Sequence, residues 1–276
     1  MSARTVAKVV TAQETSDGAG VKLLRSLGTH LLPMHDPFLM LDEFRSDQAD
    51  DYIAGFPDHP HRGFETVTYM LEGAFEHKDS VGNTGQLTSG GVQWMTAGRG
   101  IIHSEMPKQE GGMMWGFQLW VNLPRELKMT TPRYQDIAPG RVPEVKAEGV
   151  RVRVIAGTIL GAKGPVEGVA VDPTMADVKL EKGASFSLDV PATHGAFAYV
   201  FEGTARIAGT TVRRGQLAAL GEGDRVTFET DDGARILFLA ARPLHEPVAR
   251  YGPFVMNEQA EIRQAISDYQ SGRLAR

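Results

Sequence analysis

The sequence predicts an all-β protein made of two similar β domains, each a sandwich or a barrel, followed by one C-terminal helix. Two observations lead to this class. Glycines recur about every ten positions and separate short runs of β-branched and aromatic residues, a spacing typical of antiparallel strands joined by turns. A pattern from the first half of the chain also returns in the second half, which indicates a duplicated fold.

The predicted strands are short apolar runs bounded by turn residues, and they occur in both halves of the chain. The clearest ones cover residues 66–71, 117–121, 151–155, 197–201 and 235–239. Strands this close together, without long helical segments between them, favour antiparallel pairing over parallel βαβ units.

The repeat is an aromatic and apolar strand that ends in Glu-Gly. Residues 68–73 read TYMLEG, and residues 198–203 read AYVFEG, 130 positions later. In each copy a turn follows, and then a second strand that opens with a glycine, Gly91 or Gly215. Because order and spacing agree as well as residue type, we interpret the two halves as copies of one fold.

The join between the copies is expected in the stretch 132–143, whose prolines and glycine interrupt strands. We therefore assign residues 1–135 to an N-terminal domain and residues 136–276 to a C-terminal domain.

One helix is predicted at the end of the second domain. Asn257 is a suitable cap residue, and Ile262, Ile266 and Tyr269 form an apolar stripe at helical spacing before Gly272. A helix with one apolar side is expected to pack on the outside of a β domain.

Composition excludes several classes of protein. The 276 residues are 42% hydrophobic and 23% charged, which is near the globular average and rules out a disordered chain. The net charge of −5 gives no basic footprint for direct nucleic-acid binding. There is no apolar stretch long enough for a membrane span, and the first twenty residues do not resemble a secretory signal. A cytoplasmic protein without membrane contact is expected.

Two pairs of polar residues are candidates for a metal site. The chain has no cysteine, so a metal would need His, Asp or Glu ligands. His59 and His61 stand two apart, as do His103 and Glu105, and such residues share one face of a strand. Two strands together could present three imidazoles and a carboxylate, a set that suits divalent Fe, Mn, Ni, Cu or Zn. The alternative is that these are ordinary core or surface histidines.

The segments around these pairs resemble a known family. Residues 55–65, with Gly73, are similar to the first cupin motif, and residues 96–107 resemble the second motif in the form found in pirins. Residues 36–44 and 251–257 also resemble pirin signatures. The resemblance runs from about residue 20 to the end of the chain. It implies a bicupin, with two tandem double-stranded β-helix domains.

The resemblance also implies a metal and its ligands. The resemblance to pirins implies that the N-terminal cupin binds iron. One Fe(II) is the expected cofactor, with Mn, Ni, Cu or Zn as alternatives. The implied ligands are His59, His61, His103 and Glu105. In the wider cupin pattern Glu65 is a ligand, but in the pirin pattern the carboxylate at Glu105 takes its place.

The second copy is expected to lack a metal site. The repeat places Asp189, Pro191 and Gly195 opposite the three motif positions His59, His61 and Glu65. No His-x-Glu follows the second-copy glycine, and His194 is interpreted as structural.

The function implied by the resemblance is that of a quercetinase, a dioxygenase that opens the central ring of a flavonol with O2. In this hypothesis Glu105 takes the proton of the substrate hydroxyl. Phe56, Met95 and Trp115 are candidates for an apolar pocket wall, with core filling as the alternative.

Two other functions fit the same residues. Pirin relatives are also linked to protein partners, which implies a non-enzymatic regulator whose surface responds to the oxidation state of iron. A cupin isomerase acting on sugars or acids fits the fold but not the His103–Glu105 pair. The sequence leaves the physiological substrate open, and a monomer is the default expectation.

Overall fold

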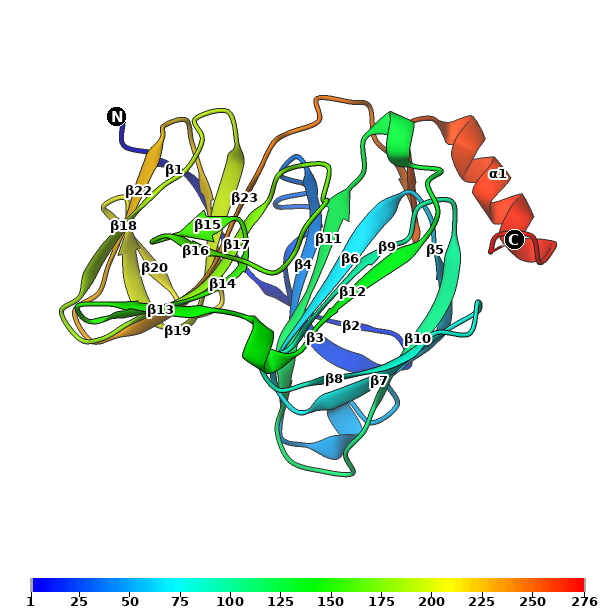
Figure 1. Cartoon of the computed structure of the whole chain (residues 1–276), viewed down its shortest axis with the longest axis horizontal. Coiled ribbons are helices and arrows are strands. Elements are labelled where there is room, and N and C mark those ends of the chain that lie inside the picture. Colours follow the sequence, from blue (N-terminus) through cyan, green and yellow to red (C-terminus); the bar gives the residue numbers. More distant parts are fainter. Residues whose placement is uncertain (1, 276) are drawn as a thin grey trace. The chain divides into compact units, whose positions relative to one another are not determined.

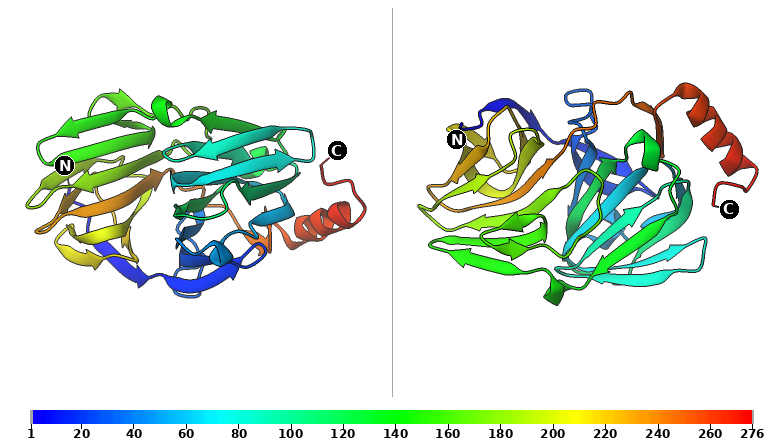
Figure 2. Two further views of the ribbon diagram at one scale, coloured as in Figure 1. Left: turned by 90° about the horizontal axis from the view of Figure 1, so that it is seen from below. Right: turned by 45° about the horizontal axis from the view of Figure 1, so that its top comes forward.

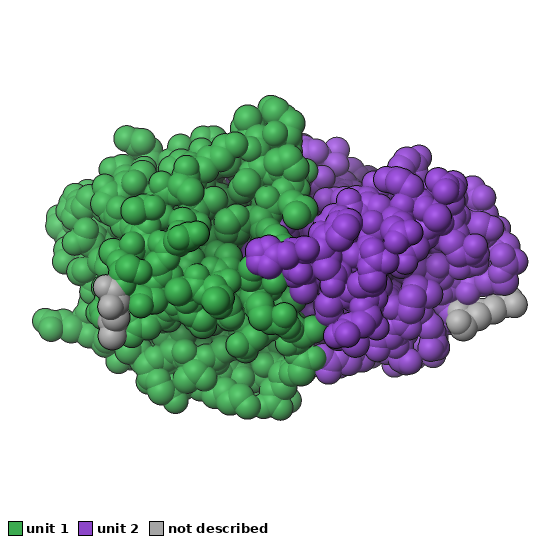
Figure 3. Space-filling model, turned by 90° about the horizontal axis from the view of Figure 1, so that it is seen from above, with its two compact units in different colours: residues 1–13, 26–37, 141–243 green, residues 14–25, 38–140, 244–276 purple. Residues whose placement is uncertain are grey.

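The computed structural model describes residues 2–275, and the chain divides into two compact units, coloured separately in Figure 3. Each unit is assembled from segments that are far apart in the sequence. Unit 1 contains residues 1–13, 26–37 and 141–243, and unit 2 contains residues 14–25, 38–140 and 244–276.

This division differs from the linear one expected at residue 135. The main change of unit falls near residue 140, but the last 33 residues, 244–276, belong with the N-terminal half. The first strand, in turn, belongs with the C-terminal half. The reason is pairing between distant segments, because β1 (Val6–Thr11) is hydrogen-bonded to β21 (Gln216–Leu220). A repeat within the sequence reveals copies of a fold but not segments that are exchanged between them.

Unit 2 is built mainly from two antiparallel sheets (Figure 1). The larger sheet has seven strands, in spatial order β12 (Arg133–Ile137), β9 (Val92–Thr96), β6 (Phe64–Glu72), β11 (Met114–Asn122), β4 (Phe38–Ser46), β3 (Val21–Leu27) and β2 (Gln13–Asp17). The smaller sheet has four, in the order β5 (Phe56–His61), β10 (Ile101–Pro107), β7 (Ala74–Asp79) and β8 (Thr84–Thr88). Two short helical turns interrupt the connections, η1 (Ala49–Asp51) and η2 (Arg125–Leu127).

Unit 1 repeats this arrangement of strands. Its main path runs β1, β21, β19 (Gly195–Ile207), β23 (Ala234–Ala241), β17 (Thr174–Leu180), β14 (Val150–Ala156) and β13 (Glu144–Ala147). The remaining elements are β15 (Thr158–Ile159), β16 (Ala162–Lys163), β18 (Ser185–Asp189), β20 (Thr210–Arg213), β22 (Arg225–Glu229) and the turn η3 (Pro139–Arg141).

The predicted repeat is confirmed by strand position. The TYMLEG segment lies in β6 up to Glu72 and the AYVFEG segment lies in β19, and each strand is the third of its path. Each also pairs with the glycine-led strand that follows it, β9 or β21. The all-β prediction is therefore correct, and the five runs named from sequence all lie in strands.

The C-terminal segment of unit 2 forms a hairpin and the predicted helix. Strands β24 (Ala249–Tyr251) and β25 (Phe254–Met256) pair with each other, and α1 (Gln259–Gln270) follows. Figure 2 shows the red helix beside the strands of its own unit. Ile262 and Ala265 pack there with Phe254 and with Ile102 of β10. No helix within residues 2–275 is long and apolar enough to cross a membrane.

The cap of this helix is Glu258 and not Asn257. Glu258 forms a capping box with Glu261, in which each side chain accepts a hydrogen bond from the other's backbone. The Asn257 amide instead donates to Glu246 and to the Pro247 carbonyl, 3.0 and 2.9 Å away. Asn257 therefore fastens the chain that leads into the helix.

Candidate metal centre

Two neighbouring strands bring the three candidate histidines together. His59 and His61 lie on β5, and in the antiparallel register His103 of β10 stands directly opposite His59. Pro60 between the pair has no N–H to donate, and β5 is the edge strand of its sheet, where a proline is tolerated. The same-face geometry expected from the His-Pro-His spacing is therefore present.

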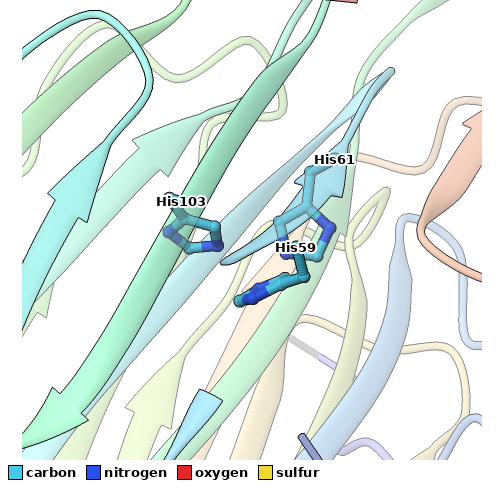
Figure 4. Close-up of side chains that lie close together, drawn as sticks. All are labelled: His59, His61 and His103. Atoms are coloured by element: carbon cyan, nitrogen blue, oxygen red, sulfur yellow. The ribbon is translucent and has the colours of Figure 1, made fainter. Parts of the chain in front are cut away.

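The imidazoles form a compact group, drawn in Figure 4. Each ring offers one nitrogen, and these three nitrogens lie within 4.8 Å of one another. His61 is 3% exposed and His103 1% exposed. Because three nitrogens this close can ligate one ion, the group fits a single metal site.

Hydrogen bonds set the direction of two of the rings. Nδ1 of His59 donates to the Pro57 carbonyl at 2.8 Å, and Nδ1 of His103 lies 3.3 Å from Nδ1 of His77. Each ring is thereby left with Nε2 for another partner. Nε2 of His103 and both ring nitrogens of His61 are buried and make no hydrogen bond of normal geometry, although the Pro253 carbonyl lies near the His61 ring.

Electrostatics keep the two buried rings neutral. Burial first, and then the neighbouring His59, hold the pKa of His61 well below its usual value. Burial, with His61, His59 and His77, does the same to the pKa of His103. A neutral imidazole is the form that binds a metal. Buried nitrogens without partners are costly in an empty core, so the donor set fits a metal ion.

Glu105 faces the same cavity as His59 and His61 but is not one of the three-nitrogen group. It lies on β10 opposite Phe56, after a register shift that follows His103. Two side chains hold its carboxylate: the Thr68 hydroxyl donates to Oε1 at 2.8 Å, and the Gln118 amide donates to Oε2 at 3.2 Å.

The cavity beside the histidines has a volume of about 530 Å³, a size typical of sites for small organic molecules. Its wall combines apolar and polar groups. The lining side chains include Met40, Phe56, Trp120, Gln118, Asp42, Arg25 and Arg250.

Of the three predicted pocket residues, Phe56 lines the cavity and the other two do not. Met95 is fully buried on β9 and packs with Ala97 and Ile101. The indole of Trp115 donates to Glu43 at 2.9 Å, and its ring lies beneath Arg45. Both lie on strands of the large sheet but outside the cavity wall, a difference that composition alone does not reveal.

Glu65 is satisfied elsewhere, as the pirin-type motif implied. Its carboxylate accepts hydrogen bonds from the Thr96 hydroxyl at 2.6 Å and the Trp94 indole at 3.1 Å. It belongs neither to the histidine group nor to the cavity wall.

A row of polar residues that sequence reasoning missed crosses the large sheet of unit 2. In the strand register, Thr68 of β6 lies opposite Gln93 on one side and Gln118 on the other, and Gln118 lies opposite Asp42. Three of these residues either hold Glu105 or line the cavity.

The same positions in unit 1 are apolar. Ala198 of β19 occupies the position of Thr68, with Ala218 and Phe238 at its sides and Ala176 beyond. All four belong to one hydrophobic core. Within residues 2–275 the only group of three or more His, Asp or Glu side chains close enough to share a metal ion is the three-histidine group of unit 2. Comparison of the two repeats, strand by strand, could have identified the polar row from sequence.

Known proteins resemble the chain over its full length. A protein of Caulobacter vibrioides named "Pirin-like protein" is 53% identical and covers 99% of this chain and 100% of its own. A "Putative quercetin 2,3-dioxygenase" of Pseudomonas aeruginosa is 49% identical, covering 99% of this chain and 98% of its own. The crystal structure of a quercetin 2,3-dioxygenase from Acinetobacter baumannii superposes with a TM-score of 0.91 at 34% identity, covering 99% of both chains.

Family models agree with these relatives. The model described as Pirin matches residues 20–121, and the model of the Pirin C-terminal cupin domain matches residues 175–275. The chain therefore belongs to the pirin family, with two cupin-type domains and a histidine group that fits one metal ion in the first of them.

Proposed function

We propose that the protein is an Fe(II)-dependent dioxygenase of the quercetinase type, which opens a flavonol ring with O2. The observation that carries the proposal is a buried three-histidine group at a cavity that also holds Glu105. The full-length likeness to proteins named quercetin 2,3-dioxygenase supports it. An isomerase has no comparable support.

The metal ligands we assign are the three histidines and Glu105. His59, His61 and His103 supply neutral nitrogens, and Glu105 supplies a carboxylate from the next inward position of β10. When bound, Fe(II) would supply Lewis acidity toward the flavonol oxygens and a redox partner for O2. Mn, Ni, Cu and Zn remain alternatives for the same donors.

Glu105 is the residue we assign to proton transfer. It takes the proton of the substrate 3-hydroxyl on a carboxylate oxygen, which makes the flavonol electron-rich. The Thr68 oxygen lies between Glu105 Oε1, at 2.8 Å, and Gln118 Oε1, at 2.6 Å. A protonated Glu105 can therefore donate to Thr68 while the Thr68 hydroxyl donates to Gln118, and the network keeps the proton in place.

The cavity wall holds the substrate ring. Trp120 packs edge-on against His61, with the ring centroids 5.3 Å apart, and Phe56 and Met40 add apolar surface. A planar aromatic ligand would displace water from this surface and lie close to the histidines.

The test is metal analysis of protein purified without oxygen, followed by a flavonol assay after loading with Fe(II), Mn(II), Ni(II) or Cu(II). We expect one metal per chain and turnover with at least one of them. H61A should lose the metal, and E105Q should lower turnover by about a hundredfold or more. H194A, outside the site, is the matched control and should behave as the wild type.

Two results would count against the proposal. Protein that binds no metal would remove the site itself. Protein that binds one metal per chain but turns over no flavonol would favour the alternative, an iron- and redox-dependent regulator that binds a protein partner.

A further inference from the structure

We infer that Arg250 forms a subsite for an acidic oxygen, a carboxylate or phenolate, on the part of the substrate that points away from the histidines. This inference rests on the proposed function, because it concerns a ligand of the same cavity. It adds a substrate class: an aromatic hydroxy compound with an acidic group on its distal ring.

Arg250 comes to the cavity from the C-terminal hairpin of unit 2. It lies on β24, and Gly252 and Pro253, which follow it in the same hairpin, also line the cavity. The guanidinium lies over the Trp120 ring, with its carbon 4.7 Å from the ring centroid. Stacking of this kind fixes the guanidinium plane and leaves its N–H groups directed sideways.

The guanidinium has more donors than partners. Of its five N–H groups, one donates to the Leu39 carbonyl at 3.2 Å. No carboxylate within residues 2–275 forms an ion pair with it at 4.0 Å or less. Burial first, and then the charge of Arg25, lower the pKa of Arg250, and the smaller opposing effects of Asp42 and Asp17 do not offset them, as expected for a cation with incomplete compensation.

The neighbouring arginine is already occupied. Arg25 forms a two-pronged pair with Asp42, at 2.8 and 2.7 Å, and a third bond to Asp17 at 3.1 Å. Asp42 is 1% exposed and has both oxygens engaged by Arg25. Of the two arginines of this wall within residues 2–275, Arg250 is therefore the one without a carboxylate partner.

The distance to the histidines sets the shape of the ligand. Trp120 lies 4.7 Å from the Arg250 guanidinium and 5.3 Å from the His61 ring, so Arg250 and His61 are at most about 10 Å apart. An aromatic scaffold of two or three rings fits within this limit. One end would meet the histidines and Glu105, and the other end would meet Arg250.

The experiment measures binding without turnover. Protein loaded with Zn(II) is titrated with 3-hydroxyflavone and with 3-hydroxyflavone carrying a 4′-carboxylate. We expect the wild type to bind the carboxylate about ten- to a hundredfold more tightly, as a charge-assisted bidentate pair would give. R250M should lose the preference and bind the two compounds with equal affinity. R250K should restore only part of the preference, because lysine lacks the planar fork.

Arg45 provides the matched control. It also stacks on a tryptophan, 4.0 Å above the Trp115 ring, but it does not line the cavity. R45M should keep the full preference for the carboxylate. The inference is overturned if R250M keeps the preference, or if the wild type binds the carboxylated compound no better than 3-hydroxyflavone.

Failure of the proposed function gives a different result. If Fe(II)-loaded protein opens neither flavonol while the Zn(II)-loaded protein shows the Arg250-dependent preference, the dioxygenase proposal fails and the subsite remains. If turnover occurs, R250M should raise KM for the carboxylated flavonol relative to KM for 3-hydroxyflavone.

Discussion

His77 shows how a side chain outside the three-nitrogen group can control it. It is 3% exposed on β7, opposite Glu105 in the register, and its Nδ1 lies 3.3 Å from Nδ1 of His103. If His103 donates the proton in this contact, its Nε2 is held as the free lone pair. Tyr134 packs edge-on against the other side of the His77 ring at 4.7 Å.

We therefore predict that H77F weakens metal binding about ten- to a hundredfold, the range seen when such outer partners are lost. H77N retains an acceptor for the His103 proton and should recover most of the affinity. Competition with a chelator measures the affinity, and the absorption spectrum of the Co(II)-loaded protein reports ligand geometry. Equal affinities for H77F and wild type, or for H77F and H77N, would contradict the role.

Lys128 is a second buried residue with a structural task. It is 1% exposed, and its ammonium donates to the Gly63 carbonyl, the Asn122 side chain and the Val255 carbonyl at 2.8–3.0 Å. The bonds join the turn after His61 and the end of β11 to the C-terminal hairpin. Burial lowers the pKa of Lys128 to about 8, against smaller opposing effects of Glu246 and Glu261.

This pKa predicts a pH-dependent stability. Below about pH 8 both folded and unfolded chains carry the Lys128 proton, and the folded state bears the full cost of burying the charge. Between about pH 8 and 10.5 the folded state releases the proton while the unfolded state keeps it, so stability rises with pH. The gain is at most about 3 kcal/mol.

K128M should remove this rise. Urea unfolding of the wild type and of K128M at pH 7.5 and pH 10 would measure it. From the lower to the higher pH, the unfolding free energy of the wild type should rise relative to that of K128M. A difference that does not change with pH would show that Lys128 stays protonated in the folded protein.

At the scale of elements, the sequence predicts the strands that carry the three histidines, β5 and β10, better than the C-terminal hairpin that packs beside them. The two-residue spacing of His59 and His61 specifies one face of a strand. Neither spacing nor composition could reveal that Arg250, Gly252 and Pro253 of the hairpin complete the cavity wall, because that contact depends on tertiary packing.

Gly63 illustrates the physical reason. Its φ is +89°, and a Cβ there would meet the Val255 carbonyl oxygen at 2.0 Å. The glycine at this cupin-motif position thus permits the C-terminal segment to pass against the turn after His61. The motif was recognisable from sequence, but the partner that requires the glycine lies almost 200 residues later in the chain. Arg250 was missed for the same reason, since its place in the cavity wall depends on the packing of the hairpin.

At the scale of the whole molecule, two copies of one strand order have diverged in their interiors. One carries the polar row and the histidines, and the other carries an apolar core of alanine, valine and phenylalanine. The chain ends are also exchanged: residues 244–276 belong to the unit with the histidines, and β1 belongs to the apolar unit. Each end therefore stabilises the half of the chain that is distant in sequence.

This exchange predicts opposite effects for two truncations. Removal of residues 244–276 takes away Arg250, the Val255 carbonyl that accepts from Lys128, and Asp268, which pairs with the buried Arg62 at 2.8 Å. Metal binding should be lost, and β5 and β10 should lose protection from hydrogen exchange, while β19 and β21 keep it.

Removal of residues 1–12 takes away β1, which pairs along β21. That variant should keep one metal per chain and lose protection in β21. Metal analysis and hydrogen exchange by mass spectrometry measure the two effects. The assignment of each chain end to the unit distant in sequence is wrong if the first truncation leaves metal binding intact or the second abolishes it. The outcome follows from where the hydrogen bonds go: a terminal segment protects the sheet it pairs or packs with, whatever its distance along the chain.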